Sequence, residues 1–172
     1  MNKNANYIRN RLSLRKPQED SLFILSELVD KLELKKDCNL EQELEKVKSS
    51  YPTCTDFERN FPSICFALAT GVGKTRLMGA FIAYLYLEKK IKNYFVLAPN
   101  LTIYNKLITD FSDSSNPKYV FQGIGEFVHN KPVIVTGDNY QYAKTLFDQS
   151  EIRINIFNIS KINAETRAGS IP

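Results

Sequence analysis

The sequence feature that most constrains this chain is a glycine-rich loop between an apolar run and a helical pattern. The loop reads Thr70-Gly71-Val72-Gly73-Lys74-Thr75, and the apolar run before it is Ser63–Ala69. After it, apolar residues recur at helical spacing from Leu77 to Leu85. A buried strand, a glycine loop and a helix in this order are typical of a phosphate-binding loop. The glycines let several backbone N–H groups converge on phosphate oxygens, and the N-terminus of the helix adds partial positive charge.

The loop also predicts roles for individual side chains. We expect the Lys74 ammonium to reach the β- and γ-phosphates of a nucleoside triphosphate and the Thr75 hydroxyl to coordinate Mg²⁺. The backbone of Thr70, Gly71, Val72 and Gly73 would complete the cradle. The full consensus places a further glycine where this chain has Leu68, so the match is to the GxGKT core. The alternative interpretation is a purely structural turn.

The rest of the chain alternates between helical and strand patterns, which predicts an α/β fold with a parallel sheet flanked by helices. Helices are expected over residues 17–35, within 36–50, from 74 to 89, and from 101 to about 111. Loop composition marks residues 51–62. Besides Ser63–Ala69, the expected strands are Tyr94–Ala98, Lys118–Phe121, Pro132–Thr136 and Arg153–Asn158.

The N-terminal residues 1–16 carry five basic side chains and no acidic one. We interpret them as a solvated basic arm, and the alternative is an arm that contacts phosphate. The net charge of the whole chain is +4, which permits nucleic acid as a partner without requiring it.

Composition excludes several classes of protein. Hydrophobic residues make up 43% of the 172 residues and charged residues 24%, which suits a packed core. Cys38, Cys54 and Cys65 form no CxxC pair, and His129 is the single histidine. This argues against a disulfide framework or a zinc module and favours a reducing, cytoplasmic compartment, with Cys65 expected inside a buried strand. No apolar run is long enough for a membrane span, so no membrane partner is expected.

Three stretches resemble motifs of superfamily 2 helicases. ALATGVGKT is similar to motif I, which in this superfamily lacks the first glycine of the consensus. The stretch ending in Gln18 resembles the Q-motif, which implies that Gln18 reads adenine and that the nucleotide is ATP; the alternative is an ordinary polar residue in the first turn of a helix. FVLAPNLTIYNK resembles motif Ia, which implies contacts of Pro99, Asn100, Thr102 and Lys106 with a DNA backbone. Asn100 or Thr102 would cap the helix there; the alternative is a plain strand-to-helix connection.

Longer stretches resemble the restriction subunit of type III restriction–modification enzymes. These are LSLRKPQEDSL, ALATGVGKTRLMGAFIAYLY, FVLAPNLTIYNKL and INIFNISKIN, and the similarity covers most of residues 11–163. The resemblance implies a P-loop NTPase with a RecA-like sheet. Residues 1–62 would form the N-terminal arm, the Q-motif helix and a connecting segment, and residues 63–172 part of the ATP-binding domain. It also implies an ATP-dependent translocase on double-stranded DNA, a DNA methyltransferase partner subunit, and further motor and nuclease domains.

The acids that such a motor needs for hydrolysis are not found. A Walker B motif would be an apolar strand ending in paired acids, and the nearest candidate, Val133–Asp138, ends in one. We interpret Asp138 as a loop residue and assign no catalytic residue. The chain is therefore expected to stop before this motif and to bind ATP and DNA weakly without hydrolysis. The alternatives are a stand-alone P-loop regulatory module, a fragment of another superfamily 2 helicase and, less well supported, a small-molecule kinase.

Overall fold

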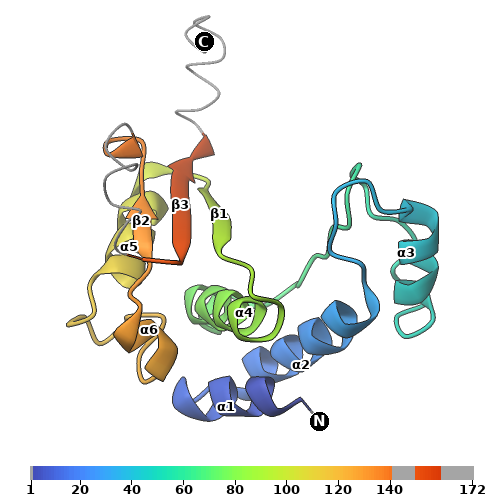
Figure 1. The fold of residues 1–172 in the computed structure, drawn as a ribbon, viewed down its shortest axis with the longest axis horizontal. Helices are drawn as coiled ribbons and strands as arrows, with labels where there is room; N and C mark the ends of the chain where they lie inside the picture. The colour runs from blue at the N-terminus through green and yellow to red at the C-terminus, as the bar shows by residue number, and fades with distance from the viewer. Residues whose placement is uncertain (1, 141–149, 160–172) are drawn as a thin grey trace, which may run out of the picture.

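The computed structural model describes residues 2–140 and 150–159 (Figure 1). In chain order, the helices and strands are α1 (Lys3–Arg11), α2 (Lys16–Lys31), α3 (Leu40–Lys48), α4 (Lys74–Lys89), β1 (Asn93–Ala98), α5 (Leu101–Ser112), α6 (Gly125–His129), β2 (Val133–Val135) and β3 (Arg153–Asn158). The expected α/β architecture is thus present, with helices packed around a small sheet. No helix of the described part is both long and apolar enough to cross a bilayer.

The sheet is parallel, as expected, with the strand order β1-β3-β2. Helix α5 contacts all three strands and covers the face on which Val96, Ile154 and Ile156 are buried. On the opposite face Phe95 is 62% exposed, and its ring stacks on that of Phe157 with the centroids 5.2 Å apart. The described sheet therefore has one covered face and one open apolar face.

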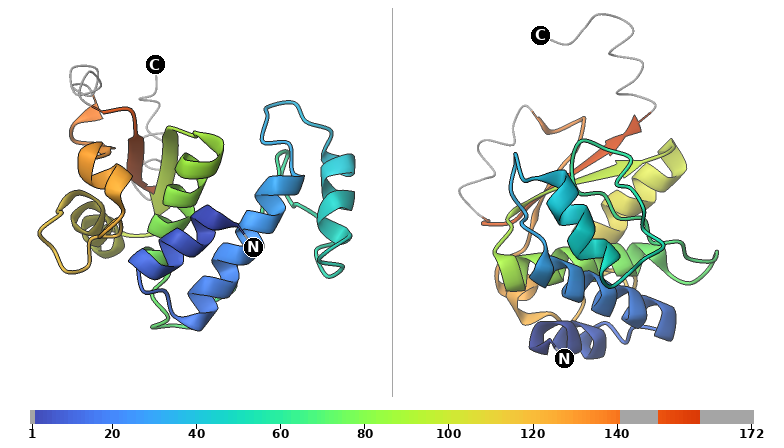
Figure 2. Two further views of the ribbon diagram at one scale, coloured as in Figure 1. Left: turned by 60° about the horizontal axis from the view of Figure 1, so that its bottom comes forward. Right: turned by 90° about the vertical axis from the view of Figure 1, so that its right-hand side faces the viewer.

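Helix α4, which follows the glycine loop, is the element on which α1, α2 and α5 pack. Helices α1 and α2 lie against it, and α5 contacts it from the sheet side (Figure 2). The Tyr84 side chain of α4 is completely buried, and its hydroxyl accepts a hydrogen bond from Asn2 Nδ2 at 2.9 Å. Helix α3 stands apart and contacts α2 (Figure 1).

The interpretation of residues 1–16 as a solvated arm is wrong. Most of this stretch is α1, whose N-terminus is capped by the Asn2 side chain. Ala5 and Ile8 are fully buried and Leu12 is nearly so. These residues recur at helical spacing and form an apolar stripe that packs on α4, so the excess of basic charge conceals an amphipathic helix.

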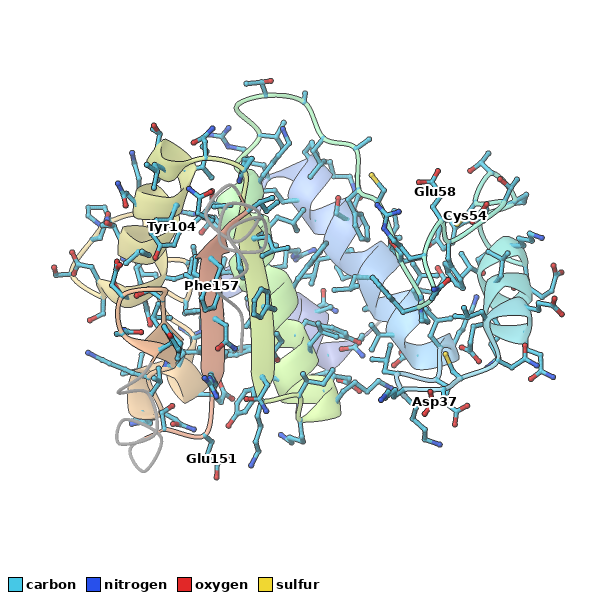
Figure 3. All side chains as sticks on the ribbon, turned by 90° about the horizontal axis from the view of Figure 1, so that it is seen from above. Asp37, Cys54, Glu58, Tyr104, Glu151 and Phe157 are labelled. Atoms are coloured by element: carbon cyan, nitrogen blue, oxygen red, sulfur yellow. The ribbon has the colours of Figure 1, made fainter. Side chains whose placement is uncertain are left out.

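The expected strand Ser63–Ala69 is also wrong, because the structure shows no strand there. Its apolar side chains pack on helices instead of a sheet. Ile64 lies against the small cluster of Leu28, Val47 and Phe57 between α2 and α3, and the Phe66 ring centroid is 4.9 Å from that of Phe81. Cys65 is exposed and not, as expected, part of a buried strand. Figure 3 shows the molecule from above, with Cys54 and Glu58 of the preceding loop near α3 and away from Tyr104 of α5 and Phe157 of β3.

The expected strand Lys118–Phe121 is a turn. Tyr119, Val120 and Phe121 are buried, and the Val120 N–H donates to the backbone carbonyl of Asp110 at 3.0 Å. An apolar run of four residues suits a buried strand and a buried turn equally well. Here it forms the turn after α5, which packs against α4 and α5. The other expected helices and strands are confirmed within a few residues, as is the loop at 51–62.

The contact between this turn and α4 gives a stability prediction. A Cβ atom on Gly79 would lie 2.6 Å from Val120 Cβ and 2.7 Å from the Val120 carbonyl oxygen. Overpacking of this kind costs about 1–3 kcal/mol and exceeds the gain of about 1 kcal/mol from the helix preference of alanine. Gly79→Ala should therefore lower the free energy of unfolding measured by urea denaturation.

The matched control is Gly137→Ala, because a Cβ atom there meets nothing within 4 Å. Its unfolding free energy should stay within about 0.5 kcal/mol of the parent chain. Equal stability of the two variants would contradict the close packing of the turn on α4.

Candidate functional site

The glycine loop has the backbone geometry that its sequence predicts. Gly71 and Gly73 have φ angles of +80° and +93°, a region that side chains with a Cβ rarely adopt. Helix α4 begins directly after Gly73, and this N-cap residue supplies no side-chain hydrogen bond to the first turn. Because the first N–H groups of a helix have no partner within the helix, they are available to an anion.

The loop opens into a pocket of about 330 Å³. Of the residues expected to bind nucleotide, Gln18, Gly71, Val72, Gly73 and Thr75 line it. They come from the start of α2 and from the loop with the first turn of α4. Ser13 and Arg15, which precede α2, and Arg76 in the first turn of α4 add to these two walls. The remaining wall is formed by Lys106 and Asp110 of α5 and by Lys118 in the segment that follows α5.

Gln18 joins the start of α2 to the loop. Its side chain is 2% exposed. Its Oε1 accepts a hydrogen bond from the Arg15 N–H and its Nε2 donates to the Gly73 carbonyl, each at 2.8 Å. A Cβ atom on Gly73 would lie 2.6 Å from Gln18 Nε2. Because residue 73 has no side chain, the backbone can adopt a positive φ angle there and the Gln18 amide can approach it closely.

Lys74 and Thr70 are not among the residues that line the pocket. The Lys74 ammonium donates to the Ala69 carbonyl at 3.2 Å, so it closes back on the loop. That bond lies at the surface, where exchange for a phosphate oxygen costs little. Thr75, the expected magnesium ligand, is half-buried and lines the pocket beside Gly73.

The structure separates the four residues that resemble motif Ia. Pro99, Asn100 and Thr102 are exposed at the start of α5, where the Asn100 side chain is the cap and accepts from the Ile103 N–H at 2.9 Å. Lys106 lies one turn further on, lines the pocket and pairs with Asp110 at 3.6 Å. Of the four, Lys106 alone lies beside the glycine loop.

Sequence reasoning missed several residues of the pocket. Arg15 donates to the Gly71 carbonyl at 3.3 Å, and Arg76 donates to the Leu12 carbonyl at 2.9 Å. Asp110 is nearly buried and could have been found, because it stands four residues after Lys106 on one helix. Lys118 carried no local signal, since only the tertiary structure brings it to the loop.

The residues around Asp138 form a loop, as expected. Strand β2 ends at Val135, and the Asn139 side chain closes the turn by accepting from the Thr136 N–H at 2.7 Å and donating to the Ile134 carbonyl at 3.1 Å. Within residues 2–140 and 150–159, no group of three or more His, Cys, Asp or Glu side chains gathers to hold a metal ion. The residues that fit a magnesium ion are those of the loop, where Thr75 would share it with a bound phosphate.

Comparison with known proteins gives one finding, a match to a protein family. No curated protein and no solved structure gives a significant match. The family described as "Type III restriction enzyme, res subunit" matches residues 11–170. This match covers most of the chain and includes both the Gln18 region and the glycine loop. The chain therefore belongs to the family of type III restriction enzyme res subunits.

Proposed function

We propose that this chain binds ATP with Mg²⁺ as the first part of an ATP-dependent translocase acting on double-stranded DNA within a type III restriction enzyme. The observation that carries the proposal is that the glycine loop, Gln18 and Thr75 line the same pocket. The methyltransferase subunit, the rest of the motor and the nuclease would be its partners in the whole enzyme. Residues 1–62 and 63–172 would work as one unit, because α1 and α2 pack directly on α4.

The phosphates of the nucleotide would bind at the start of α4. A Cβ atom on Gly71 would meet nothing within 4 Å, so the loop has open space on the side of its positive-φ turn. Uncapped N–H groups and the partial charge of the helix N-terminus favour an anion there. Lys74 would leave the Ala69 carbonyl for the β- and γ-phosphates, and Thr75 would hold the Mg²⁺ that the phosphates bring with them.

The adenine would bind at Gln18. Its carboxamide already contacts Arg15 and Gly73, but an amide has two donor hydrogens on nitrogen and two lone pairs on oxygen. The second hydrogen and the second lone pair match N7 and the N6 amino group of adenine. Gln18 would thus connect recognition of the base with the shape of the phosphate loop.

Double-stranded DNA would contact the start of α5. The residues exposed there are Pro99, Asn100 and Thr102. The N-terminus of a helix carries partial positive charge, which would attract the phosphates of the DNA backbone. Lys106 would add a full charge to the same backbone grip. Contacts of this kind position a strand without reading its sequence.

ATP binding rather than hydrolysis would be the contribution of this chain. Of the residues that the structure describes along the pocket, Asp110 alone is acidic, and its carboxylate lies 3.6 Å from the Lys106 ammonium. A carboxylate held in this way is occupied as a counter-ion, and we assign it no role as a base.

The first test is Lys74→Ala. Losing a charged contact to phosphate costs about 1.5–3 kcal/mol, so ATP affinity measured by calorimetry should fall more than about tenfold while the fold is retained. Lys89→Ala is the control, because it removes the same charge at the opposite end of α4, where Lys89 pairs with Asp30 at 3.6 Å. Unchanged affinity in Lys74→Ala would refute the proposed phosphate site.

The second test separates adenine recognition from support of the loop. Gln18→Ala removes both, so its affinity for ATP is compared with its affinity for inorganic tripolyphosphate. If Gln18 reads adenine, ATP binding should weaken by about tenfold and tripolyphosphate binding by clearly less. An equal loss for both ligands would show that the residue acts on the loop alone.

The third test concerns DNA. Lys106→Ala should weaken binding of duplexes of unrelated sequence to the same extent, and the slope of log affinity against log salt should become shallower by about one. Binding is measured by fluorescence anisotropy at several salt concentrations. A loss confined to one duplex sequence would contradict a backbone grip.

A further inference from the structure

The pocket beside the glycine loop is strongly cationic. Among the described residues that line it, four are basic (Arg15, Arg76, Lys106 and Lys118) and one, Asp110, is acidic. Clefts lined by one sign of charge concentrate ligands of the opposite sign. The excess of positive charge therefore suits a ligand that carries several negative charges.

Three of these basic side chains form a hydrogen bond or an ion pair with another group of the protein. Arg15 donates to the Gly71 carbonyl, Arg76 donates to the Leu12 carbonyl, and Lys106 pairs with Asp110. In the part of the chain that the structure describes, the Lys118 ammonium has no such partner. Of the four, it is the one whose cationic group contacts neither a carbonyl nor a carboxylate within the described residues.

The backbone that carries Lys118 is firmly held. The Asn116 side chain accepts from the Lys118 N–H at 2.9 Å, and the next residues, Tyr119 and Val120, are buried. Val120 sits against Gly79 of α4, which has no side chain to separate them, and its N–H is bonded to Asp110 of α5. Lys118 is thus fixed relative to the helix that begins at the phosphate loop.

Lys118 and Gln18 lie on different walls of the pocket. Helix α4 contacts α2 on one side and α5 on the other. Gln18 comes from α2, whereas Lys118 follows α5 and is anchored to it through Asp110. A nucleotide whose base lies at Gln18 and whose first phosphates lie on the loop would extend its last phosphate toward the α5 wall.

We propose that Lys118 is a further phosphate-binding residue of the nucleotide site, one that contacts the terminal phosphate of ATP. The proposal rests on nucleotide binding at the glycine loop. Lys118 would then contribute to the preference for a triphosphate over a diphosphate, a role separate from the cradle formed by Gly71, Gly73 and Lys74.

The test measures the affinities of the full chain for ATP and for ADP, each with Mg²⁺, in Lys118→Gln. We expect ATP affinity to fall about tenfold and ADP affinity by about twofold or less, because only ATP carries the phosphate that the ammonium contacts. Lys118→Arg keeps the charge and should restore ATP affinity to within about twofold of the parent chain. Lys36→Gln, at an exposed position between α2 and α3, removes the same charge away from the pocket and should change neither affinity.

Two outcomes would overturn the proposal. In the first, Lys118→Gln binds ATP as tightly as the parent chain does and also binds ADP as tightly. In the second, Lys118→Gln loses affinity for DNA while its affinity for ATP is unchanged. If Lys74→Ala loses ATP and Lys118→Gln does not, Lys118 alone has been misassigned. If neither variant affects ATP binding, the nucleotide site itself is wrong.

Discussion

The arrangement of the site depends on one contact, the hydrogen bond from Gln18 Nε2 to the Gly73 carbonyl. It holds the turn that precedes α4 against the start of α2 at 2.8 Å, with Gln18 almost fully buried and Gly73 exposed. The contact is available because Gly73 has a positive φ angle and no Cβ atom. A buried side-chain amide that loses its partner is costly, so the glycine loop and the N-terminal helices are structurally coupled.

Helices α1 and α2 support the helix that follows the glycine loop. They bury the outer side of α4, and the hydrogen bond between Asn2 and Tyr84 extends this packing to the beginning of the described chain. On its other side α4 meets α5 and the turn at Val120. Helix α4 is therefore packed on two sides, and the pocket at its start is lined by residues at or beside α2, α4 and α5.

The sequence was sufficient for the parts of the fold that depend on local patterns. The glycine loop, the helix after it, the strand and helix around Pro99, and the last described strand all carry their periodicity in consecutive residues. The segment before the loop could not be predicted in the same way. Ser63–Ala69 is apolar enough for a buried strand, but strand formation needs a hydrogen-bonded neighbour, and here its side chains pack on helices.

The same distinction applies to the site. Gln18, Gly71, Gly73 and Thr75 were predicted from motifs and lie around one pocket. Arg15, Arg76 and Lys118 were not predicted as pocket residues, because isolated basic residues are usually solvated. Arg76 directly follows the glycine loop in the sequence, whereas tertiary packing brings Arg15 and Lys118 to it. Lys106 was predicted from its resemblance to motif Ia, and the structure places it on the pocket beside the glycine loop.

The central claim is that this pocket is where ATP binds, and the most direct test is a titration of the isotope-labelled chain with Mg²⁺-ATP followed by amide NMR shifts. The account predicts saturable shifts at Gly71, Gly73, Thr75 and Gln18, with residues 51–67 beside α3 unaffected. Saturable shifts confined to residues 51–67, or no shifts at the glycine loop at millimolar ATP, would contradict it.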